Sequence, residues 1–464
     1  MKVVIVGGVA AGTKVAAKLK RENPQDEIVI YTKGDDISYA GCGLPYYIGG
    51  SIETREELIV NTPAKFMGLT GTEVHTGSEV VAVDADAKTI SVQADGLQSV
   101  SYDKLVIAVG AEPSVPPVEG TGLSGVFTVR TPKDAIEARK YAEEKGCKRA
   151  VVVGGGFIGL EVAENLMARG IMVTVMDMAP QLMPNIFDTE MADYVRRKLQ
   201  EKGMRILTGT ALHAIAGAEA VSGVQTGMGM LPADMVVLAA GIRPATKFLV
   251  GTGLEMERGC IVTDEYQQTN LPDIYAVGDC ALVKNRITGK RQWSAMGSTA
   301  NIAGRALALS LGDSKTAYSG CLGTGVVKLA DGLNAAKTGL TEEQAKAEGL
   351  RTVSVLCVTD DKAHYYPGSG IFITKLIADG DTHKLLGMQV IGGGAVDKMT
   401  DIAVAGISMG CKVEDFITMD FAYAPPFSTA IHPFAAACGI LLNKMSGRLD
   451  SFTPAEYAAG AGNG

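Results

Sequence analysis

A strand–glycine loop–helix unit occurs twice in the chain and limits the folds it can adopt. An apolar run at 2–6 leads into the loop 7–12, and a second run at 149–153 leads into the loop 154–159. A strand that turns through glycines into a helix presents free backbone N–H groups at the positive helix end, where a pyrophosphate binds. The second loop matches G-x-G-x-x-G in full, whereas Val9 replaces the middle glycine of the first. Two such units predict two Rossmann-like dinucleotide-binding domains.

The second unit also indicates which nicotinamide nucleotide it binds. Its next apolar run, 172–176, ends at Asp177, 23 residues after Gly154. An acidic side chain at this distance accepts hydrogen bonds from the ribose hydroxyls of NAD and repels a 2′-phosphate. Because residues 178–181 provide no positive charge, the sequence favours NADH over NADPH.

A third signal lies at 273–279, where Asp-Ile-Tyr-Ala-Val-Gly-Asp follows an apolar-rich segment. It resembles the second FAD fingerprint of flavoproteins with two dinucleotide sites, whose aspartate, here Asp279, contacts the ribitol and phosphate region. Apolar runs that end in glycine, at 105–110 and 235–241, are predicted to lead the chain between two domains. We therefore expect one dinucleotide to be FAD and the other to be NAD.

A single cysteine, Cys42, follows the first unit within the stretch 38–47. Flavin enzymes that reduce an internal disulfide need two neighbouring thiols, often as C-x-x-x-x-C, but the fifth residue after Cys42 is Tyr47. A lone thiol beside a flavin must take its partner sulfur or oxygen from the substrate. We predict that Cys42 is catalytic rather than a buried structural thiol, and that a helix beginning after it lowers its pKa.

The composition excludes several classes of protein. A net charge of −8 over 464 residues argues against nucleic-acid binding. The eight cysteines include no C-x-x-C spacing, so no metal site is predicted. Nothing resembles a signal peptide and no apolar run reaches membrane-spanning length, so we expect no membrane association and a cytoplasmic protein with reduced thiols.

From Lys2 to Leu449 the chain resembles the pyridine nucleotide–disulfide oxidoreductases. Within this family it is most similar to the single-cysteine branch of coenzyme A-disulfide reductases, NADH oxidases, NADH peroxidases and persulfide reductases. The resemblance rests on the stretch around Cys42 and on two further motifs, His-Tyr-Tyr-Pro-Gly at 364–368 and Ala-Tyr-Ala-Pro-Pro-Phe-Ser at 422–428. It implies a homodimer with shared active sites, in which Tyr365 and Tyr423 reach the reactive cysteine of the partner chain.

The resemblance also implies an α/β fold with three domains. A split FAD-binding domain is expected at 1–115 and 246–322, and a Rossmann-like NAD-binding domain at 116–245. An α+β dimerisation domain would follow at 323–449, with a C-terminal tail at 450–464.

Loops, strand ends and the family pattern together give a set of candidate site residues. Those expected to bind FAD or NAD are Gly7, Val9, Ala10, Ala11, Gly12, Thr32, Lys33, Val80, Ala108, Gly110, Asp279, Thr299, Ala300, Gly154, Gly156, Phe157, Ile158, Gly159, Glu161, Asp177 and Gly241. Those expected near the substrate are Ser38, Asn301 and three basic residues of the first helix, Lys18, Lys20 and Arg21, whose charges suit the phosphates of coenzyme A. The expected catalytic residues are Cys42, Tyr365 and Tyr423.

Two departures from the family pattern concern these sites. Thr32-Lys33 stands where the family commonly has Glu-Lys for the FAD ribose, and threonine cannot make the bidentate carboxylate contact. Ile431-His432-Pro433 stands where Lys-Asp-Pro is usual, near the expected substrate path. We expect His432 to be a satisfied or exposed side chain rather than a base.

Three hypotheses for the activity stay open. The first is an NADH-dependent flavoprotein that reduces coenzyme A disulfide, or a related persulfide or mixed disulfide, through Cys42. The second is an NADH oxidase that uses oxygen or a quinone; Ala10 counts against it, because the best-known oxidases and peroxidases have histidine there. The third is a redox-sensing flavoprotein that acts through a partner.

Overall fold

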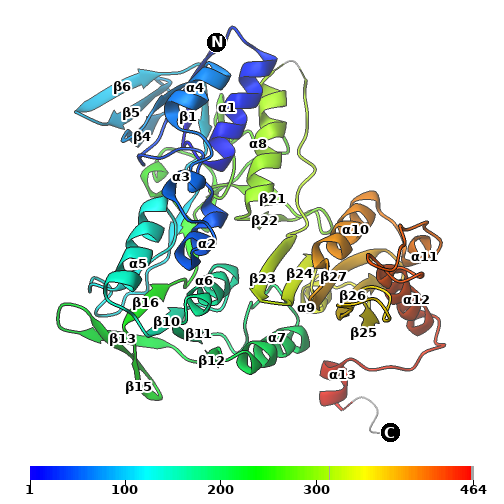
Figure 1. The fold of residues 1–464 in the computed structure, drawn as a ribbon. Coiled ribbons are helices and arrows are strands. Elements are labelled where there is room, and N and C mark those ends of the chain that lie inside the picture. Colours follow the sequence, from blue (N-terminus) through cyan, green and yellow to red (C-terminus); the bar gives the residue numbers. More distant parts are fainter. Residues whose placement is uncertain (313, 461–464) are drawn as a thin grey trace.

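The computed structural model describes residues 1–312 and 314–460. Three five-stranded sheets, each with its own helices, contain most of the regular structure (Figure 1). The first two sheets are parallel, and the third is antiparallel. Two Rossmann-like domains and an α+β C-terminal domain are therefore confirmed. The last four residues of the expected tail, 461–464, lie outside the described residues.

The first sheet has the strand order β20-β7-β1-β2-β3. Its strands are β1 (Lys2–Val6), β2 (Glu27–Tyr31), β3 (Glu73–His75), β7 (Lys104–Ile107) and β20 (Ile274–Ala276). One face packs on the helices α1 (Ala10–Glu22) and α8 (Gly297–Leu311), which lie side by side in Figure 1. The other face packs on a small antiparallel sheet of β4 (Glu79–Asp84), β5 (Thr89–Gln93) and β6 (Leu97–Ser101).

The second sheet repeats this arrangement, with the order β12-β11-β10-β16-β9. Its strands are β9 (Val126–Phe127), β10 (Arg149–Val153), β11 (Met172–Met176), β12 (Arg205–Leu207) and β16 (Met235–Leu238). Helices α5 (Pro132–Glu144), α6 (Phe157–Ala168) and α7 (Thr189–Glu201) cover one face. The strands β13 (Leu212–Gly217), β14 (Val221–Thr226) and β15 (Gly229–Pro232) cover the other.

The two segments predicted to lead the chain between domains pair with each other. The pairing is made by the residues that directly follow the predicted segments 105–110 and 235–241, which form the antiparallel strands β8 (Ala111–Pro113) and β17 (Ile242–Pro244). Short elements complete the part of the chain before the C-terminal sheet: η1 (Gly41–Gly43), α2 (Leu44–Gly49), α3 (Arg55–Leu58), α4 (Pro63–Thr70), η2 (Lys247–Leu249), β18 (Met256–Glu257), β19 (Cys260–Ile261), β21 (Leu282–Lys284) and β22 (Arg291–Trp293).

The C-terminal sheet has the order β23-β24-β27-β26-β25. Its strands are β23 (Gly325–Ala330), β24 (Leu333–Gly339), β25 (Thr352–Asp360), β26 (Ile371–Asp379) and β27 (Leu385–Gly392). Its helices are α9 (Glu342–Ala347), α10 (Val396–Met409), α11 (Val413–Phe416) and α12 (Pro433–Met445), and α13 (Pro454–Ala458) follows in the expected tail.

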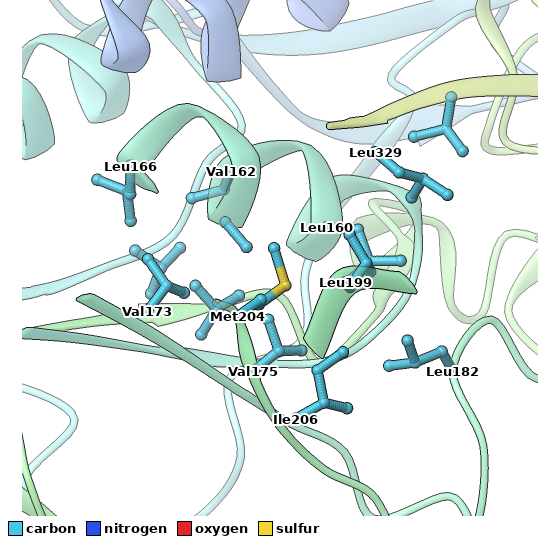
Figure 2. Packing of buried hydrophobic residues seen from close by; sticks show 14 of the residues in the cluster. Leu160, Val162, Leu166, Val173, Val175, Leu182, Leu199, Met204, Ile206 and Leu329 are labelled. Atoms are coloured by element: carbon cyan, nitrogen blue, oxygen red, sulfur yellow. The ribbon is translucent and has the colours of Figure 1, made fainter. Parts of the chain in front are cut away.

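One apolar cluster joins the second sheet to the C-terminal sheet. Figure 2 shows Leu160 and Val162 of α6 packed over Val175 of β11, with Leu199 of α7 and Leu329 of β23 at the same cluster. Leu44 and Ile48 of α2 belong to it too. The segment after Cys42 is therefore fixed against the NAD-type unit by burial of apolar surface. No helix in the described part of the chain is long and apolar enough to span a membrane.

Candidate active site

The first glycine loop closes tightly against the end of β7. Gly7 has a φ of 109°, and a Cβ there would lie 2.2 Å from the Ala108 carbonyl oxygen. A Cβ at Gly12 would lie 1.9 Å from the Gly7 carbonyl oxygen. Glycine is therefore required at both positions. Helix α1 begins at Ala10, and Val9 before it provides no side-chain cap, so the first N–H groups of the helix are free for an anion.

The second loop has the same geometry. Gly154 has a φ of 116°, and a Cβ there would lie 2.1 Å from the Ala239 carbonyl oxygen. A Cβ at Gly159 would lie 1.9 Å from the Gly154 carbonyl oxygen. Gly156 is the N-cap residue of α6, provides no side-chain cap and faces open space, so a ligand can approach its backbone closely. Both loops fit a dinucleotide pyrophosphate.

Asp177 lies directly beside the second loop. One of its carboxylate oxygens accepts a hydrogen bond from Gly155 N at 2.7 Å, and the other accepts one from Ala179 N at 2.8 Å. Two backbone donors therefore fix this carboxylate directly after β11, beside the second glycine loop.

The residues predicted around the FAD adenosine are arranged less uniformly. Thr32 is buried at the end of β2 and next to the first loop, 3.4 Å from a Cβ placed on Gly8. Lys33 is exposed and forms an ion pair with Glu79 at 2.9 Å. Val80 belongs to β4 and is buried in the core between β4 and the first sheet. Thr32 therefore stands at the nucleotide edge, whereas Lys33 interacts with the neighbouring strand.

Asp279 forms an ion pair that the sequence did not predict. It follows β20 and its carboxylate lies 3.4 Å from Nη2 of Arg130, which comes from the second Rossmann-like unit. Burial raises the pKa of Asp279, and Arg130 opposes this effect. Trp293 Nε1 donates to the Asp279 carbonyl oxygen at 2.8 Å. No motif marks Arg130, so only the tertiary structure identifies it.

The remaining cofactor candidates lie at strand and helix ends. Ala108 and Gly110 follow β7, and Gly241 follows β16. At the start of α8, Thr299 and Ala300 are buried, and the Thr299 hydroxyl lies 2.9 Å from the Ser294 hydroxyl. These positions surround the ends of the parallel strands, where ligands bind in open α/β sheets.

Cys42 is the one exposed cysteine among the eight, all of which are free and lie within the described residues. It lies in the 3₁₀ turn η1, directly before α2. The prediction of a lowered pKa is wrong for this structure. Although the residue is exposed, partial burial of its thiol raises the pKa of Cys42, the carboxylates of Glu161 and Asp279 raise it further, and Arg130 opposes them. Helix α2 has only six residues, so its dipole is small.

Glu161 connects the NAD-type unit to the cysteine segment. Its Oε1 accepts a hydrogen bond from the Tyr46 hydroxyl of α2 at 3.4 Å. Burial raises the pKa of Glu161 to about 7, the Tyr46 hydrogen bond opposes this and Glu164 adds to it. The sequence placed Glu161 among the cofactor contacts but did not identify Tyr46 as its partner.

Tyr365 and Tyr423 lie together but away from Cys42 of the same chain. Both are exposed, and a hydrogen bond with Tyr423 raises the pKa of Tyr365. Tyr365 follows β25 and Tyr423 precedes α12, and Figure 1 shows these elements on the far side of β23 and β24 from α2. Within one chain the structure therefore does not bring the three predicted catalytic residues together.

The basic cluster predicted for coenzyme A is divided. Lys18 forms an ion pair with Glu22, one turn further along α1. Lys20 Nζ donates to the Asp26 carbonyl oxygen at 2.6 Å. Arg21 is exposed. The positive charge available to a phosphate is therefore smaller than the sequence suggests.

The polar substrate candidates interact locally. Ser38 Oγ accepts from Asn61 Nδ2 at 3.3 Å, and Asn301 Nδ2 donates to the Gly297 carbonyl oxygen at 2.8 Å. His432 is buried and its Nδ1 accepts from Phe434 N at 3.2 Å, which caps α12. The expectation of a satisfied histidine at 432 agrees with this contact.

Comparison with known proteins identifies the family. Residues 1–300 match the model for "Pyridine nucleotide-disulphide oxidoreductase", and residues 331–435 match the model for its dimerisation domain. An NADH oxidase of Methanocaldococcus jannaschii is 35% identical over 97% of this chain and 100% of its own length. An NAD(P)H coenzyme A polysulfide/persulfide reductase of Pyrococcus horikoshii is 34% identical, over 95% of this chain and 98% of its own.

A solved structure, the reduced CoADR-RHD of Bacillus anthracis, superposes with a TM-score of 0.96 at 36% identity. The superposition covers 100% of this chain and 84% of that one. Fold, glycine loops and whole-length similarity all agree. The chain belongs to the pyridine nucleotide-disulphide oxidoreductase family.

Proposed function

We propose that this chain is an NADH-dependent flavoprotein that reduces coenzyme A disulfide, or a related persulfide or mixed disulfide, through Cys42. The exposed Cys42 thiol, in the turn between the first glycine loop and α2, is the observation that favours this function most. Among the described residues, no second exposed cysteine is present that could form an internal disulfide with Cys42.

Separate parts of the chain would bind the two nucleotides. The loop 7–12 and Asp279 would bind FAD, and the loop 154–159 and Asp177 would bind NADH. When bound, FAD supplies the two-electron carrier between the nicotinamide and the thiol. The Gly156 position leaves space for the NADH pyrophosphate.

The overall reaction consumes one NADH, one proton and one disulfide, and releases NAD⁺ and two thiols. The Cys42 thiolate attacks one sulfur of the substrate, the substrate S–S bond breaks, and the first thiol leaves with a proton. Two electrons then cleave the mixed disulfide and release the second thiol. Glu161 and Arg130, which act on the pKa of Cys42 in opposite directions, would control how much thiolate is present.

A homodimer would complete the site. Tyr365, Phe427 and Ile431 are 67%, 74% and 71% exposed on the C-terminal domain, and they provide apolar surface that a partner subunit would cover. In the dimer we expect Tyr365 and Tyr423 to protonate the thiolate that leaves at the partner's Cys42.

An NADH oxidase is the second candidate, because relatives at 35% and 29% identity are named NADH oxidases. The test is anaerobic NADH oxidation with coenzyme A disulfide, in wild type and in Cys42→Ser. Turnover that disappears in the variant would support the disulfide mechanism. If coenzyme A disulfide is not reduced, while oxygen or a quinone supports NADH oxidation in both wild type and the variant, the result would support the oxidase. A redox sensor would show neither turnover, yet change its binding of a partner with NADH.

A further inference from the structure

A short segment, residues 181–188, joins the second glycine loop to the C-terminal domain; we refer to it as the bridging segment. Met183 N donates to the Gly155 carbonyl oxygen at 2.9 Å. The Leu182 side chain packs so closely on the loop that a Cβ at Gly155 would lie 2.6 Å from its Cδ2. The bridging segment therefore packs directly against the second glycine loop.

The backbone of the bridging segment adopts an unfavourable conformation. Met183 and Asn185 have φ values of 47° and 64°, a region that residues with a Cβ rarely adopt. Such a conformation persists only where surrounding contacts enforce it. The C-terminal domain contacts this segment at Asn185 and at Asp188.

Asp188, the last residue of the bridging segment, is buried and makes a reciprocal pair of hydrogen bonds with Gln389 of β27. Asp188 N donates to Gln389 Oε1 at 2.8 Å, and Gln389 Nε2 donates to Asp188 Oδ2 at 2.6 Å. Glu342 N, at the start of α9, donates to the same carboxylate oxygen at 3.1 Å. Gln344 of α9 adds a hydrogen bond to the Asn185 carbonyl oxygen at 3.0 Å.

A buried lysine forms ion pairs with this carboxylate and with two others. Lys375 of β26 is 1% exposed, and its ammonium lies 3.1 Å from Asp188, 2.6 Å from Glu190 and 2.7 Å from Glu342. Buried charges are retained only when they are paired and hydrogen bonded. Lys375 and its three carboxylate partners therefore form a network with one favourable arrangement. This arrangement fixes α7, which begins after Asp188, relative to the C-terminal sheet.

The network continues to the nucleotide side. Gly155, whose carbonyl oxygen contacts the bridging segment, donates its N–H to Asp177. The contacts thus run from Gln389 to Asp188, along the chain to Phe187, whose N–H donates to the Met183 carbonyl oxygen at 3.3 Å, and then through Gly155 to Asp177. The Asp177 carboxylate and the C-terminal sheet therefore belong to one connected set of contacts.

We propose that the C-terminal domain sets the affinity of the second glycine loop for NADH through Gln389 and Asp188. Both are positioning residues that do not touch the nucleotide. The inference rests on the proposed use of NADH at the loop 154–159. It implies that an event on the C-terminal domain, such as dimer formation, changes NADH affinity without touching Cys42.

The test compares Gln389→Met with Thr374→Val in the FAD-loaded enzyme. Methionine keeps the volume of Gln389 but makes no hydrogen bond to Asp188. Thr374 is equally buried, lies next to Lys375 in β26, and has a hydroxyl without a hydrogen-bond partner among the described residues, so it controls for a change in the same core. Calorimetric titration with ADP-ribose measures the loop directly, because this probe carries no hydride.

We expect the ADP-ribose Kd and the KM for NADH of Gln389→Met to rise about tenfold, with kcat at saturating NADH unchanged. Thr374→Val should leave all three at wild-type values. Unchanged affinity in Gln389→Met, or the same change in both variants, would overturn the inference. Should Gln389→Met fail to fold, Gln344→Ala removes the more exposed contact with Asn185, and a rise of about threefold in Kd is expected; no rise overturns the inference equally.

This outcome is separable from that of the proposed function. ADP-ribose binding does not require a disulfide substrate or Cys42. A chain that binds ADP-ribose as expected but does not reduce coenzyme A disulfide would retain the inference and lose the proposed acceptor.

Discussion

The Tyr46 hydroxyl donates to the Glu161 carboxylate at 3.4 Å, and this contact joins α2 to α6 between the two Rossmann-like units. Glu164, one turn further along α6, forms an ion pair with Lys328 of β23 at 2.8 Å. The two glutamates thus have different partners, since Glu161 has only a neutral hydroxyl as its hydrogen-bond donor. The difference explains why burial raises the pKa of Glu161 to about 7.

Glu161→Gln should change how stability depends on pH. The folded state binds the Glu161 proton more tightly than the unfolded chain, whose glutamate has the ordinary pKa of 4.5. Unfolding therefore releases a proton between pH 4.5 and 7, and wild type loses stability as the pH rises through this range. Thermal unfolding at pH 5 and pH 8 should show that the stability of the variant relative to wild type is higher at pH 8 than at pH 5.

Glu164→Gln is the matched control for this measurement. It removes the Lys328 ion pair, although Lys328 keeps a second contact with Asp331 at 3.2 Å. We expect a small loss of stability, of about 1 kcal/mol or less, similar at both pH values. An equal pH effect in the two variants would contradict the assignment to Glu161.

His432→Asn should reduce sensitivity to acid. Burial lowers the pKa of His432 from 6.5 to about 4, and Lys398 adds to this effect. The unfolded chain therefore binds the proton more tightly, and wild type loses stability as the pH falls from 6.5 to 4, by at most about 1.4 kcal/mol per pH unit. Asparagine can still cap α12 without titrating. Urea unfolding is measured at several pH values between 6.5 and 4. The free energy of unfolding should fall less steeply with decreasing pH in the variant than in wild type. The same pH dependence in both proteins would exclude His432 as its source.

The repeated units and their glycines could be predicted because local backbone geometry requires them. Gly7 and Gly154 each pack against a strand-end carbonyl, and no other residue fits there. Cys42 could be identified because a lone thiol in that motif has few other roles. Domain boundaries and the individual ligand contacts stay predictions.

The rest depends on contacts between distant segments. Arg130 reaches Asp279 across 149 residues of sequence, and Lys375 reaches Glu190 across 185. No local pattern records such pairs. The pKa of Cys42 was predicted in the wrong direction for the same reason, because the burial that raises it, and the carboxylates of Glu161 and Asp279 that add to this effect, depend on other elements.

Asp177→Asn should weaken the discrimination against NADPH. The side chain keeps its size and one acceptor oxygen for Gly155 N or Ala179 N, but it loses the charge that repels a 2′-phosphate. We expect the ratio of kcat/KM for NADH to that for NADPH to fall about tenfold, which corresponds to ~1.4 kcal/mol. Steady-state kinetics with both nucleotides measure this ratio. A ratio that stays at the wild-type value would assign nucleotide choice to other residues.

Gly49→Ala should disturb the segment that positions Cys42. Gly49 ends α2, and a Cβ there would lie 2.2 Å from Oδ1 of Asn165, which is buried in α6. Because Asn165 donates to the Glu161 carbonyl oxygen at 2.9 Å, it cannot move away without losing that bond. Helices α2 and α6 must therefore separate, which lowers the free energy of unfolding by roughly 1–3 kcal/mol. The rate at which the Cys42 thiol is alkylated should change as well.

Gly68→Ala provides the opposite case in the same region of the chain. Gly68 lies inside α4, and a Cβ there meets no atom within 4 Å. Alanine should therefore stabilise the protein by roughly 0.5–1 kcal/mol, since it restricts the unfolded chain without a clash. Thermal unfolding and the alkylation rate of Cys42 are measured for both variants. If Gly49→Ala were as stable as Gly68→Ala, and its thiol reacted at the wild-type rate, α2 would not depend on close contact with α6 to place Cys42.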